Sequence, residues 1–338
     1  MQQIYDKCQG AGVHWRPHCK AHKSPDIAKL LIKRGAVGIT CAKLAEAESM
    51  FSAGIENILI ANQIVGVIKI SRLMSLISRG AVIAVSVDSS SNVRDLAEAC
   101  RQTGNVLEVM IEIDSGSARA GVEPGEPVLS LAREILTHAQ LKLRGLMTWE
   151  GHTVRIADPQ AKHMAIVAAI TKLTDSAELC RSNDIKIEVV SCGGTGTYRT
   201  SAALPGVTEI QAGGGIFGDV HYRKLYHVPV EYALFMQTTV TSRPSSTRII
   251  CDAGKKAMSS DTGVPIPLVP GLVNKVSFSA EHSKIELAEP SDTPHVAGKI
   301  LWITGYADST VHLHQRIYAV REGKVVAEWR IPSDSRLL

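Results

Sequence analysis

Nine residues near the start of the chain gather basic and imidazole side chains around one proline, in the order Trp15-Arg16-Pro17-His18-Cys19-Lys20-Ala21-His22-Lys23. Alternating character predicts a short strand over residues 13–20, and Ser24-Pro25 predicts the N-cap and first position of a helix. Lys20 then lies at the C-terminal end of a strand, where parallel α/β folds place their chemistry. An amine crowded by other cations gives up its proton more readily and can attack a carbonyl carbon. A solvated basic turn is the alternative interpretation.

Two glycine-rich segments offer a second kind of chemistry. Ser191-Cys192-Gly193-Gly194-Thr195-Gly196-Thr197 and Gly213-Gly214-Gly215 each follow a predicted strand. Glycine lets backbone N–H groups approach phosphate oxygens, and hydroxyl groups donate further hydrogen bonds. Either segment alone could be an ordinary turn. Together they predict a phosphate site, because the loops after strands seven and eight of a barrel commonly bind phosphate. Phosphate beside a reactive lysine suits pyridoxal 5'-phosphate (PLP), which withdraws electrons from the α-carbon of an amino acid.

The elements that would position these residues alternate regularly up to residue 225. Eight short apolar stretches, rich in β-branched residues, predict strands buried on both faces, and the segments between them predict helices. The predicted strands are 13–20, 36–40, 57–61, 81–87, 107–113, 141–147, 185–190 and 207–211. The predicted helices are 26–34, 43–53, 64–78, 93–101, 127–138 and 161–181. Eight such units within about 210 residues predict a (β/α)8 TIM-type barrel rather than an open sheet.

The pattern changes after Tyr226, where runs of strand character follow one another without long helices between them. These runs are 228–241, 247–252, 272–280, 298–304, 310–320 and 324–331. Glu322-Gly323 is typical of a hairpin turn. We therefore predict an α/β protein with two domains, a PLP-binding barrel over residues 1–225 and an antiparallel β domain over residues 226–338.

Composition excludes several classes of function. The 338 residues are 45% hydrophobic and 21% charged, with a net charge of only +4, so nucleic acid is not an expected partner. No stretch approaches the roughly 18 apolar residues of a membrane helix, and residues 1–7 lack the apolar core of a signal peptide. Seven cysteines without a C-x-x-C pair argue against a disulfide scaffold, so we expect a cytoplasmic protein with no membrane partner.

Several motifs resemble, in order, those of the D-threonine aldolase and D-serine dehydratase family, fold-type III PLP enzymes related to alanine racemase. They are Arg16-Pro17-His18-x-Lys20-x-His22-Lys23, Gly35-Ala36-Val37-Gly38, Glu46-Ala47, Ile58-Leu59-Ile60-Ala61-Asn62, Asp114-x-Gly116-x-x-Arg119-x-Gly121, Glu150-Gly151-His152, Gly193-Gly194-Thr195-Gly196-Thr197 and Leu313-His314. The resemblance covers nearly the whole chain. It implies the barrel, the C-terminal β domain, Lys20 as the Schiff-base lysine, a small-molecule amino-acid substrate and a homodimer.

The resemblance and the predicted strand ends together define a candidate site. Cofactor contacts are expected from Lys20, His18, Arg119, Trp149, Ser191, Gly193, Gly194, Thr195, Gly213 and Gly214. Catalytic roles are expected for Lys20, His152, Tyr306 and Asp308. His22 and Arg155 are candidates for substrate contacts, and Arg155 could pair with a second substrate carboxylate.

The chain departs from the family where a divalent metal is usual. Members carry His-x-Asp (aldolases) or His-x-Cys (dehydratases) near the C-terminus, whereas this chain has Tyr306-Ala307-Asp308. Asp308 keeps the aldolase form, but one carboxylate without an imidazole is a poor site for Mn²⁺, Mg²⁺ or Zn²⁺. We expect metal binding at Asp308 to be weak or absent. Trp149 stands where a tyrosine is usual, and its indole cannot accept a hydrogen bond.

The prediction for function is a PLP-dependent carbon–carbon lyase. It would act on D-configured β-hydroxy amino acids by retro-aldol cleavage, giving a smaller amino acid and an aldehyde. Dehydration of D-serine or D-hydroxyaspartate by β-elimination, or amino-acid racemisation, is the alternative on the same scaffold. A PLP carrier without turnover is less consistent with residues 226–338, since single-domain carriers resemble the barrel alone.

Overall fold

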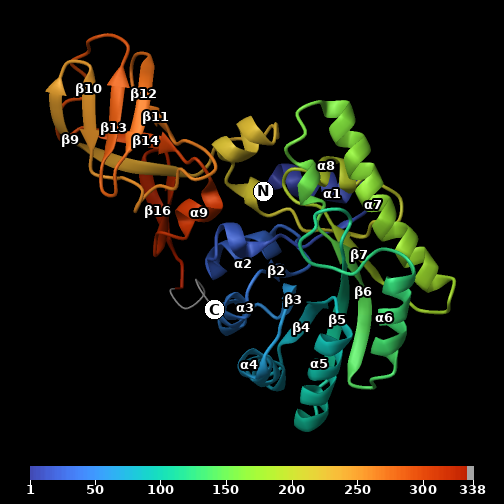
Figure 1. The fold of residues 1–338 in the computed structure, drawn as a ribbon. Helices are drawn as coiled ribbons and strands as arrows, with labels where there is room; N and C mark the ends of the chain where they lie inside the picture. The colour runs from blue at the N-terminus through green and yellow to red at the C-terminus, as the bar shows by residue number, and fades with distance from the viewer. Residues whose placement is uncertain (333–338) are drawn as a thin grey trace. The chain divides into compact units, whose positions relative to one another are not determined.

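The computed structural model describes residues 1–332 and divides the chain into two compact units (Figure 1). The first unit comprises Met1–Gly214 with the segment that begins at Arg316, and the second comprises Gly215–Gln315. The cut falls after Gly214, whereas the prediction placed it after residue 225, and the last hairpin is grouped with the first unit. There the backbone N–H of Arg330 donates to the Asp26 carboxylate at 3.4 Å.

The first unit contains eight parallel strands with helices between them (Figure 1), as the sequence predicted. The strands are β1 (His14–Trp15), β2 (Ile39–Cys41), β3 (Asn57–Gln63), β4 (Val82–Val87), β5 (Leu107–Ile113), β6 (Leu141–Thr148), β7 (Val189–Cys192) and β8 (Glu209–Ile210). The helices are α1 (Gln2–Gly10), α2 (Pro25–Lys33), α3 (Leu44–Ser52), α4 (Val67–Ser78), α5 (Ser90–Thr103), α6 (Glu126–Leu136), α7 (Pro159–Arg181) and α8 (Tyr198–Ser201).

The sheet curls into the predicted barrel. Its strand order is β1-β8-β7-β6-β5-β4-β3-β2, and all neighbouring pairs are parallel. A parallel bridge between His18 and Thr40 brings the two ends of the sheet together, and Thr40 N–H donates to the Pro17 carbonyl at 3.0 Å. Side chains that point inward fill the barrel, with a buried apolar layer of Leu59, Met110 and Met147 at mid-height.

Two elements near the N-terminus differ from prediction. Helix α1 was not predicted, and only Ile4 and Cys8 of this polar segment are buried. The expected strand over residues 13–20 is limited to His14–Trp15, followed by a 3₁₀ turn, η1 (Cys19–Ala21). Pro17 has no N–H to donate, so the regular strand ends before it, although isolated backbone contacts to Gln211 and Thr40 continue at His18. Helix α2 begins as predicted, with Ser24 at the N-cap and Pro25 as its first residue.

The second unit is built on an antiparallel sheet, which confirms the predicted class of the C-terminal part. Its strands are β9 (Phe235–Ser245), β10 (Arg248–Cys251), β11 (Ile266–Leu268), β12 (Val273–Phe278), β13 (Ser283–Leu287) and β14 (Lys299–Ile303), in the order β11-β14-β9-β10-β13-β12. Trp302 is fully buried in its core, and the indole N–H donates to the Thr238 hydroxyl at 2.9 Å. Short helical segments η4 (His221–Leu225) and α9 (Ala307–Val311) lie outside the sheet.

The predicted strand over residues 310–320 is wrong in its first part, because residues 307–311 form α9 and only β15 (Arg316–Arg321) is extended. Strand β16 (Lys324–Arg330) completes the final hairpin. Its turn is at Glu322-Gly323, as predicted, and both residues have positive φ, 51° and 74°. Within residues 1–332, no helix has the length and apolar character needed to cross a membrane.

Candidate functional site

Lys20 is presented by the η1 turn directly after β1. The backbone N–H of His18 donates to the Gln211 carbonyl at 3.1 Å, which fixes the start of the turn to the strand pair β1–β8. The Nδ1 atom of His18 then accepts the backbone N–H of Lys20 at 3.4 Å. Lys20 itself is exposed. Lys20 therefore lies just beyond the C-terminal end of the first strand, as the sequence predicted.

Cations gather around this turn, as the sequence suggested. Burial, followed by the positive charges of neighbouring groups, holds the pKa of His18 well below its ordinary value. These neighbours are Lys20, His22, Lys23 and Arg119. Arg119 comes from the loop after β5, far along the chain, so the fold brings this predicted cofactor contact to the lysine turn. His18 is consequently a neutral imidazole at physiological pH.

His22 is fully buried next to the lysine turn. Its Nδ1 atom accepts the backbone N–H of Ser24 at 3.1 Å, so the ring proton of the neutral form is on Nε2. Burial lowers the pKa of His22 to about 3, and this neutral form therefore predominates. Within residues 1–332, Nε2 has no hydrogen-bond partner. A buried donor without a partner is costly, and this one is available to an acceptor on a bound molecule.

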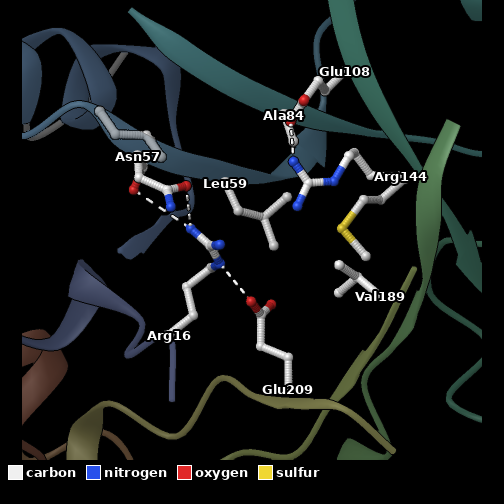
Figure 2. Close-up of a pocket in the computed structure, with 10 residues that line it drawn as sticks. Arg16, Asn57, Leu59, Ala84, Glu108, Arg144, Val189 and Glu209 are labelled. Carbon is white, nitrogen blue, oxygen red and sulfur yellow. Dashed lines mark hydrogen bonds and ion pairs between the residues drawn. The ribbon is translucent and has the colours of Figure 1, made fainter. Parts of the chain in front are cut away.

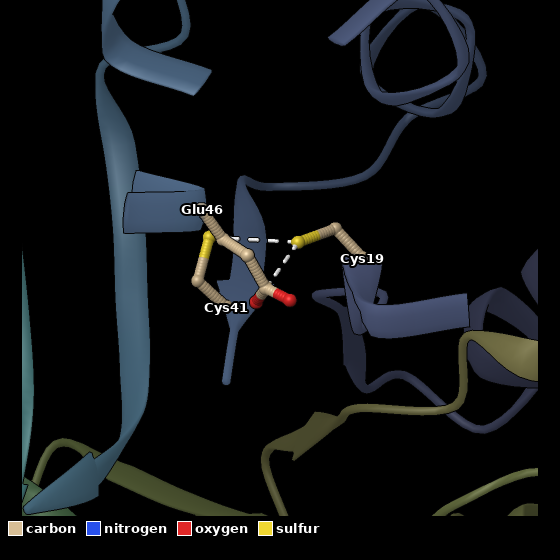
Figure 3. Close-up of side chains that lie close together, drawn as sticks. All are labelled: Cys19, Cys41 and Glu46. Atoms are coloured by element: carbon tan, nitrogen blue, oxygen red, sulfur yellow. Dashed lines mark hydrogen bonds between the residues drawn. The ribbon is translucent and has the colours of Figure 1, made fainter. Parts of the chain in front are cut away.

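A buried cluster fixes the lysine turn to β2 and α3 (Figure 3). Glu46 pairs with Lys23, and its carboxylate also accepts the backbone N–H of Ala42. The Cys19 thiol lies 3.5 Å from the Cys41 sulfur and 3.8 Å from Glu46 Oε2. These contacts hold both ends of η1.

The ligand atoms of Cys19, Cys41 and Glu46 all lie within 4.8 Å of one another, a spacing that a metal ion could use. Zinc and similar ions bind thiolates, however, and burial raises the pKa of the Cys19 thiol well above its ordinary value. Glu46 is already paired with Lys23. The cluster therefore fits a protonated, hydrogen-bonded clamp better than a metal site.

The predicted phosphate loop after β7 lies against the loop after β6. A Cβ atom on Gly194 would lie 2.3 Å from the ring of Trp149, so only glycine allows this close approach. Glu150 is fully buried beneath the loop and accepts hydrogen bonds from the Gly193 N–H at 3.3 Å and the Ser201 hydroxyl at 2.7 Å. The two predicted contacts Trp149 and Gly194 are thus brought together.

The second glycine segment touches the lysine turn itself. A Cβ atom on Gly213 would lie 2.1 Å from the carbonyl oxygen of His18. Gly214 follows it as the first residue of η3 (Gly214–Ile216). Thr195 is buried in the loop after β7. Ser191 is different, because its hydroxyl donates to Glu209 at 2.8 Å and accepts from Gln211 at 2.9 Å inside the barrel.

His152 and Arg155 lie after β6, and both are exposed. His152 belongs to the turn η2 (Gly151–Thr153), and a Cβ atom on Gly116 would lie 3.1 Å from its Nε2 atom. The loop that carries Gly116 and Arg119 is shaped by Asp114, whose Oδ1 accepts the N–H groups of Gly116 and Ser117, each at 2.8 Å. His152 is therefore next to the Arg119 loop.

Tyr306 and Asp308 lie in the second unit. Tyr306 caps α9, and its phenol is hydrogen-bonded to Asp308. Burial, and then the nearby Asp308 charge, raise the pKa of Tyr306, so the phenol keeps its proton. The ring of Tyr306 lies 4.6 Å from that of His221, between centroids.

Asp219 connects the η4 segment with the start of α9, the helix that carries Asp308. Its carboxylate accepts the backbone N–H of Tyr222 and that of Ala307, each at 2.7 Å, and so ties η4 to the start of α9. Burial raises the pKa of Asp219 to about 7. A protonated phenol already bonded to the neighbouring carboxylate does not fit the usual imidazole–carboxylate pair around a divalent ion.

At the opposite ends of the strands, charged residues close the barrel (Figure 2). Arg16 pairs with Glu209 at 2.8 Å and donates to the Asn57 side chain at 2.9 Å. Arg144 pairs with Glu108, also at 2.8 Å. The first arginine of the motif therefore stabilises the barrel, while the lysine of the same motif faces its other end.

Three carboxylates that the structure buries, those of Glu46, Glu112 and Glu150, were given no role by sequence reasoning, although Glu46 and Glu150 belong to the motifs quoted above. Each anchors a candidate site residue or loop: Glu46 binds Lys23, Glu112 binds Arg119, and Glu150 binds the Gly193 loop. One signal was available. Glu112 is an acidic residue within the otherwise apolar run Val109-Met110-Ile111-Glu112-Ile113, where an unpaired charge would be costly.

Known proteins resemble this chain in both sequence and architecture. The family model described as alanine racemase, N-terminal domain, matches residues 1–221, and the putative serine dehydratase domain matches residues 233–320. A 3-hydroxy-D-aspartate aldolase of Paracoccus denitrificans (strain Pd 1222) is 31% identical, covering 98% of this chain and 87% of that protein. A D-threo-3-hydroxyaspartate dehydratase of Delftia sp. (strain HT23) is 33% identical over 78% of this chain and 69% of that protein. The crystal structure of a D-threonine aldolase from Filomicrobium marinum superimposes with a TM-score of 0.92, at 33% identity, covering 98% and 91% of the two chains.

Proposed function

From the premise that the chain belongs to the alanine racemase N-terminal domain family, we propose that it is a PLP-dependent lyase that cleaves D-configured β-hydroxy amino acids. The products are a smaller amino acid and an aldehyde. Relatives named as aldolases match along nearly the whole length of both chains, which supports carbon–carbon cleavage. The presence of a second, antiparallel unit agrees with an enzyme rather than a single-domain carrier.

One observation carries the proposal: an exposed lysine lies on a turn that touches a glycine segment able to cradle an anion. Lys20 is two residues from His18, whose carbonyl group leaves no room for a side chain at Gly213. The buried Nε2 atom of His22 has no partner within residues 1–332. The donor set of backbone N–H groups, threonine hydroxyls and cations fits a phosphorylated aldehyde.

The proposed roles follow from these placements. Lys20 would hold the cofactor covalently, the loops at Gly193 and Gly213 would bind its phosphate, and Arg119 would contact its ring. When bound, PLP withdraws electrons from the substrate α-carbon. Trp149 offers an apolar face beside the Gly194 loop.

Cleavage also requires removal of the proton on the substrate β-hydroxyl. His152, Tyr306 and Asp308 are the proposed groups for this proton. In this relay the phenol oxygen of Tyr306 would accept the hydroxyl proton while the phenol's own proton moves to the Asp308 carboxylate, and His152 is the alternative acceptor. Because this pair does not fit a divalent cation, we assign no step to a metal ion.

A second candidate function is β-elimination of water. It is favoured by the similarity to a D-threo-3-hydroxyaspartate dehydratase, although that match covers less of both chains. Two relatives are named for hydroxyaspartate, which favours a dicarboxylic substrate. The exposed guanidinium of Arg155 could bind the second carboxylate of such a substrate.

Product analysis separates these functions. Purified protein with added PLP is incubated with D-threonine, D-serine and both diastereomers of 3-hydroxy-D-aspartate. Release of an aldehyde with glycine is the expected result, whereas a 2-oxo acid with ammonia would indicate the dehydratase. The Lys20→Ala variant serves as the control and should form neither product. Absence of both products with every substrate would contradict the proposal. A homodimer is also proposed, and light scattering of the same sample tests it.

A further inference from the structure

The barrel interior is arranged in layers along β5. Every second side chain of a strand points to the same face, and on the inward face of β5 these are Glu108, Met110 and Glu112. Glu108 pairs with Arg144 at the end where the strands begin, and Met110 lies in the apolar middle layer. Glu112 is therefore the inward residue nearest the end that carries Lys20.

Glu112 is a buried carboxylate with several donors around it. It is 2% exposed. Its Oε2 atom accepts from Gln63 Nε2 at 2.7 Å and lies 3.5 Å from the Ser86 hydroxyl, while Oε1 accepts from Arg119 Nη2 at 3.1 Å. The register between β3 and β4 shifts just before Gln63, and an irregularity of this kind changes the direction in which a side chain points. An ionised carboxylate tolerates such burial only when it is paired in this way.

Arg119 depends on this carboxylate for its position. Its side chain is 59% exposed, and within residues 1–332 its guanidinium makes one hydrogen bond, the one in the ion pair with Glu112. A long side chain that is mostly in water samples many rotamers unless something holds it. One end of the Arg119 loop is fixed by Gly121, whose N–H donates to Asp88 at 3.2 Å, but that contact does not orient the guanidinium.

We propose that Glu112 is a positioning residue, which holds Arg119 in place for the cofactor ring and supplies a counter-charge to the cations around Lys20. This inference rests on the proposed function, since it assumes that PLP binds at Lys20. Gln63 supports it by fixing the second oxygen of the carboxylate. The other nearby carboxylates are engaged elsewhere: Glu46 pairs with Lys23, while Asp114 and Asp88 accept backbone N–H groups of the Arg119 loop. Loss of the charge at 112 therefore leaves Arg119 unrestrained and the rim more positive.

The test compares Glu112→Gln with Glu108→Gln. Both variants remove one carboxylate from the same face of β5 and break one pair with an arginine, but Glu108 lies about 13 Å away along the strand. For each protein the PLP dissociation constant and the pH midpoint of the bound cofactor's visible absorbance are measured. Thermal unfolding without cofactor shows whether each variant folds.

Glu112→Gln should weaken PLP binding about tenfold and lower the absorbance midpoint by about half a pH unit, because a more positive rim disfavours protonation of the bound cofactor. Glu108→Gln should change neither quantity. In an Arg119→Ala background, adding Glu112→Gln should cause no further loss of PLP affinity, since the two residues act as one unit.

The outcomes separate this inference from the proposed function. A wild-type protein that binds no PLP would overturn both. A wild-type protein that binds PLP, together with a folded Glu112→Gln variant whose affinity and midpoint are unchanged, would overturn the positioning role alone. Equal losses in Glu112→Gln and Glu108→Gln would also overturn it, because they would indicate a general effect on the barrel.

Discussion

Replacement of Gly213 by alanine should disturb the lysine turn through direct backbone contact. The new Cβ atom would lie 2.1 Å from the oxygen, 2.7 Å from the nitrogen and 2.9 Å from the carbonyl carbon of His18. All three are backbone atoms, so no flexible side chain can move aside. A carbon and a carbonyl oxygen ordinarily stay at least about 3.3 Å apart, so one backbone must move by about 1 Å.

The size of the effect follows from this displacement. Overpacking of a filled interior costs about 1–3 kcal/mol of stability. His18 precedes Lys20 by two residues, and its imidazole accepts the Lys20 N–H, so the shift should reach the lysine. Displacement of a reacting group by about 1 Å can cost about 100-fold in rate. We therefore expect Gly213→Ala to lose about 1–3 kcal/mol of unfolding free energy and about 100-fold in kcat/KM.

Urea unfolding and an aldehyde-release assay measure these two quantities. Gly10→Ala is a matched control, because a Cβ atom there meets nothing within 4 Å and Gly10 lies at the end of α1. That variant should retain wild-type activity and stability. Wild-type activity and stability in Gly213→Ala would refute the reasoning, since they would show that the loop after β8 retreats without moving the lysine turn.

Three further predictions concern Tyr306, the divalent metal and His22. Tyr306→Phe should slow turnover about 100-fold with PLP affinity unchanged, because only the proton donor to Asp308 is removed. Tyr226→Phe is the control. Normal turnover of Tyr306→Phe would limit Tyr306 to a packing role. A chelator should leave aldehyde release nearly intact, whereas complete loss with rescue by Mn²⁺ or Zn²⁺ would reveal a metal site. The pKa of His22 is lowered to about 3 in the folded chain, so below about pH 6.5 the imidazole takes up a proton on unfolding. The free energy of unfolding therefore falls as pH decreases, by at most about 1.4 kcal/mol per pH unit. His22→Gln should flatten this pH dependence in urea titrations, and identical slopes for both proteins would contradict the assignment.

The barrel and the position of Lys20 could be predicted because they depend on local patterns. Short β-branched runs between amphipathic helices predict parallel strands, and Ser24-Pro25 marks the start of α2. The gathering of Arg119 with the lysine turn followed from the rule that strand ends meet at one edge of the barrel.

Other features depend on tertiary contacts that no local pattern encodes. Thr310 and Val311 have strand character, but they lie in α9, whose first N–H group donates to Asp219 from a distant segment. Ser191 is predicted to contact the cofactor because it precedes the glycine loop, and the bonds of its hydroxyl to Glu209 and Gln211 could not be predicted from the sequence. The supporting roles of Glu46, Glu112 and Glu150 could not be predicted, because their partners are brought close only by folding.

The covalent attachment of PLP to Lys20 is tested most directly by reduction and peptide mapping. The protein with bound PLP is treated with borohydride, digested and analysed by mass spectrometry. The account predicts a pyridoxyl group on the peptide that contains Lys20, at Lys20 itself. A pyridoxyl group on Lys23 or on another lysine, or no modified peptide at all, would contradict it.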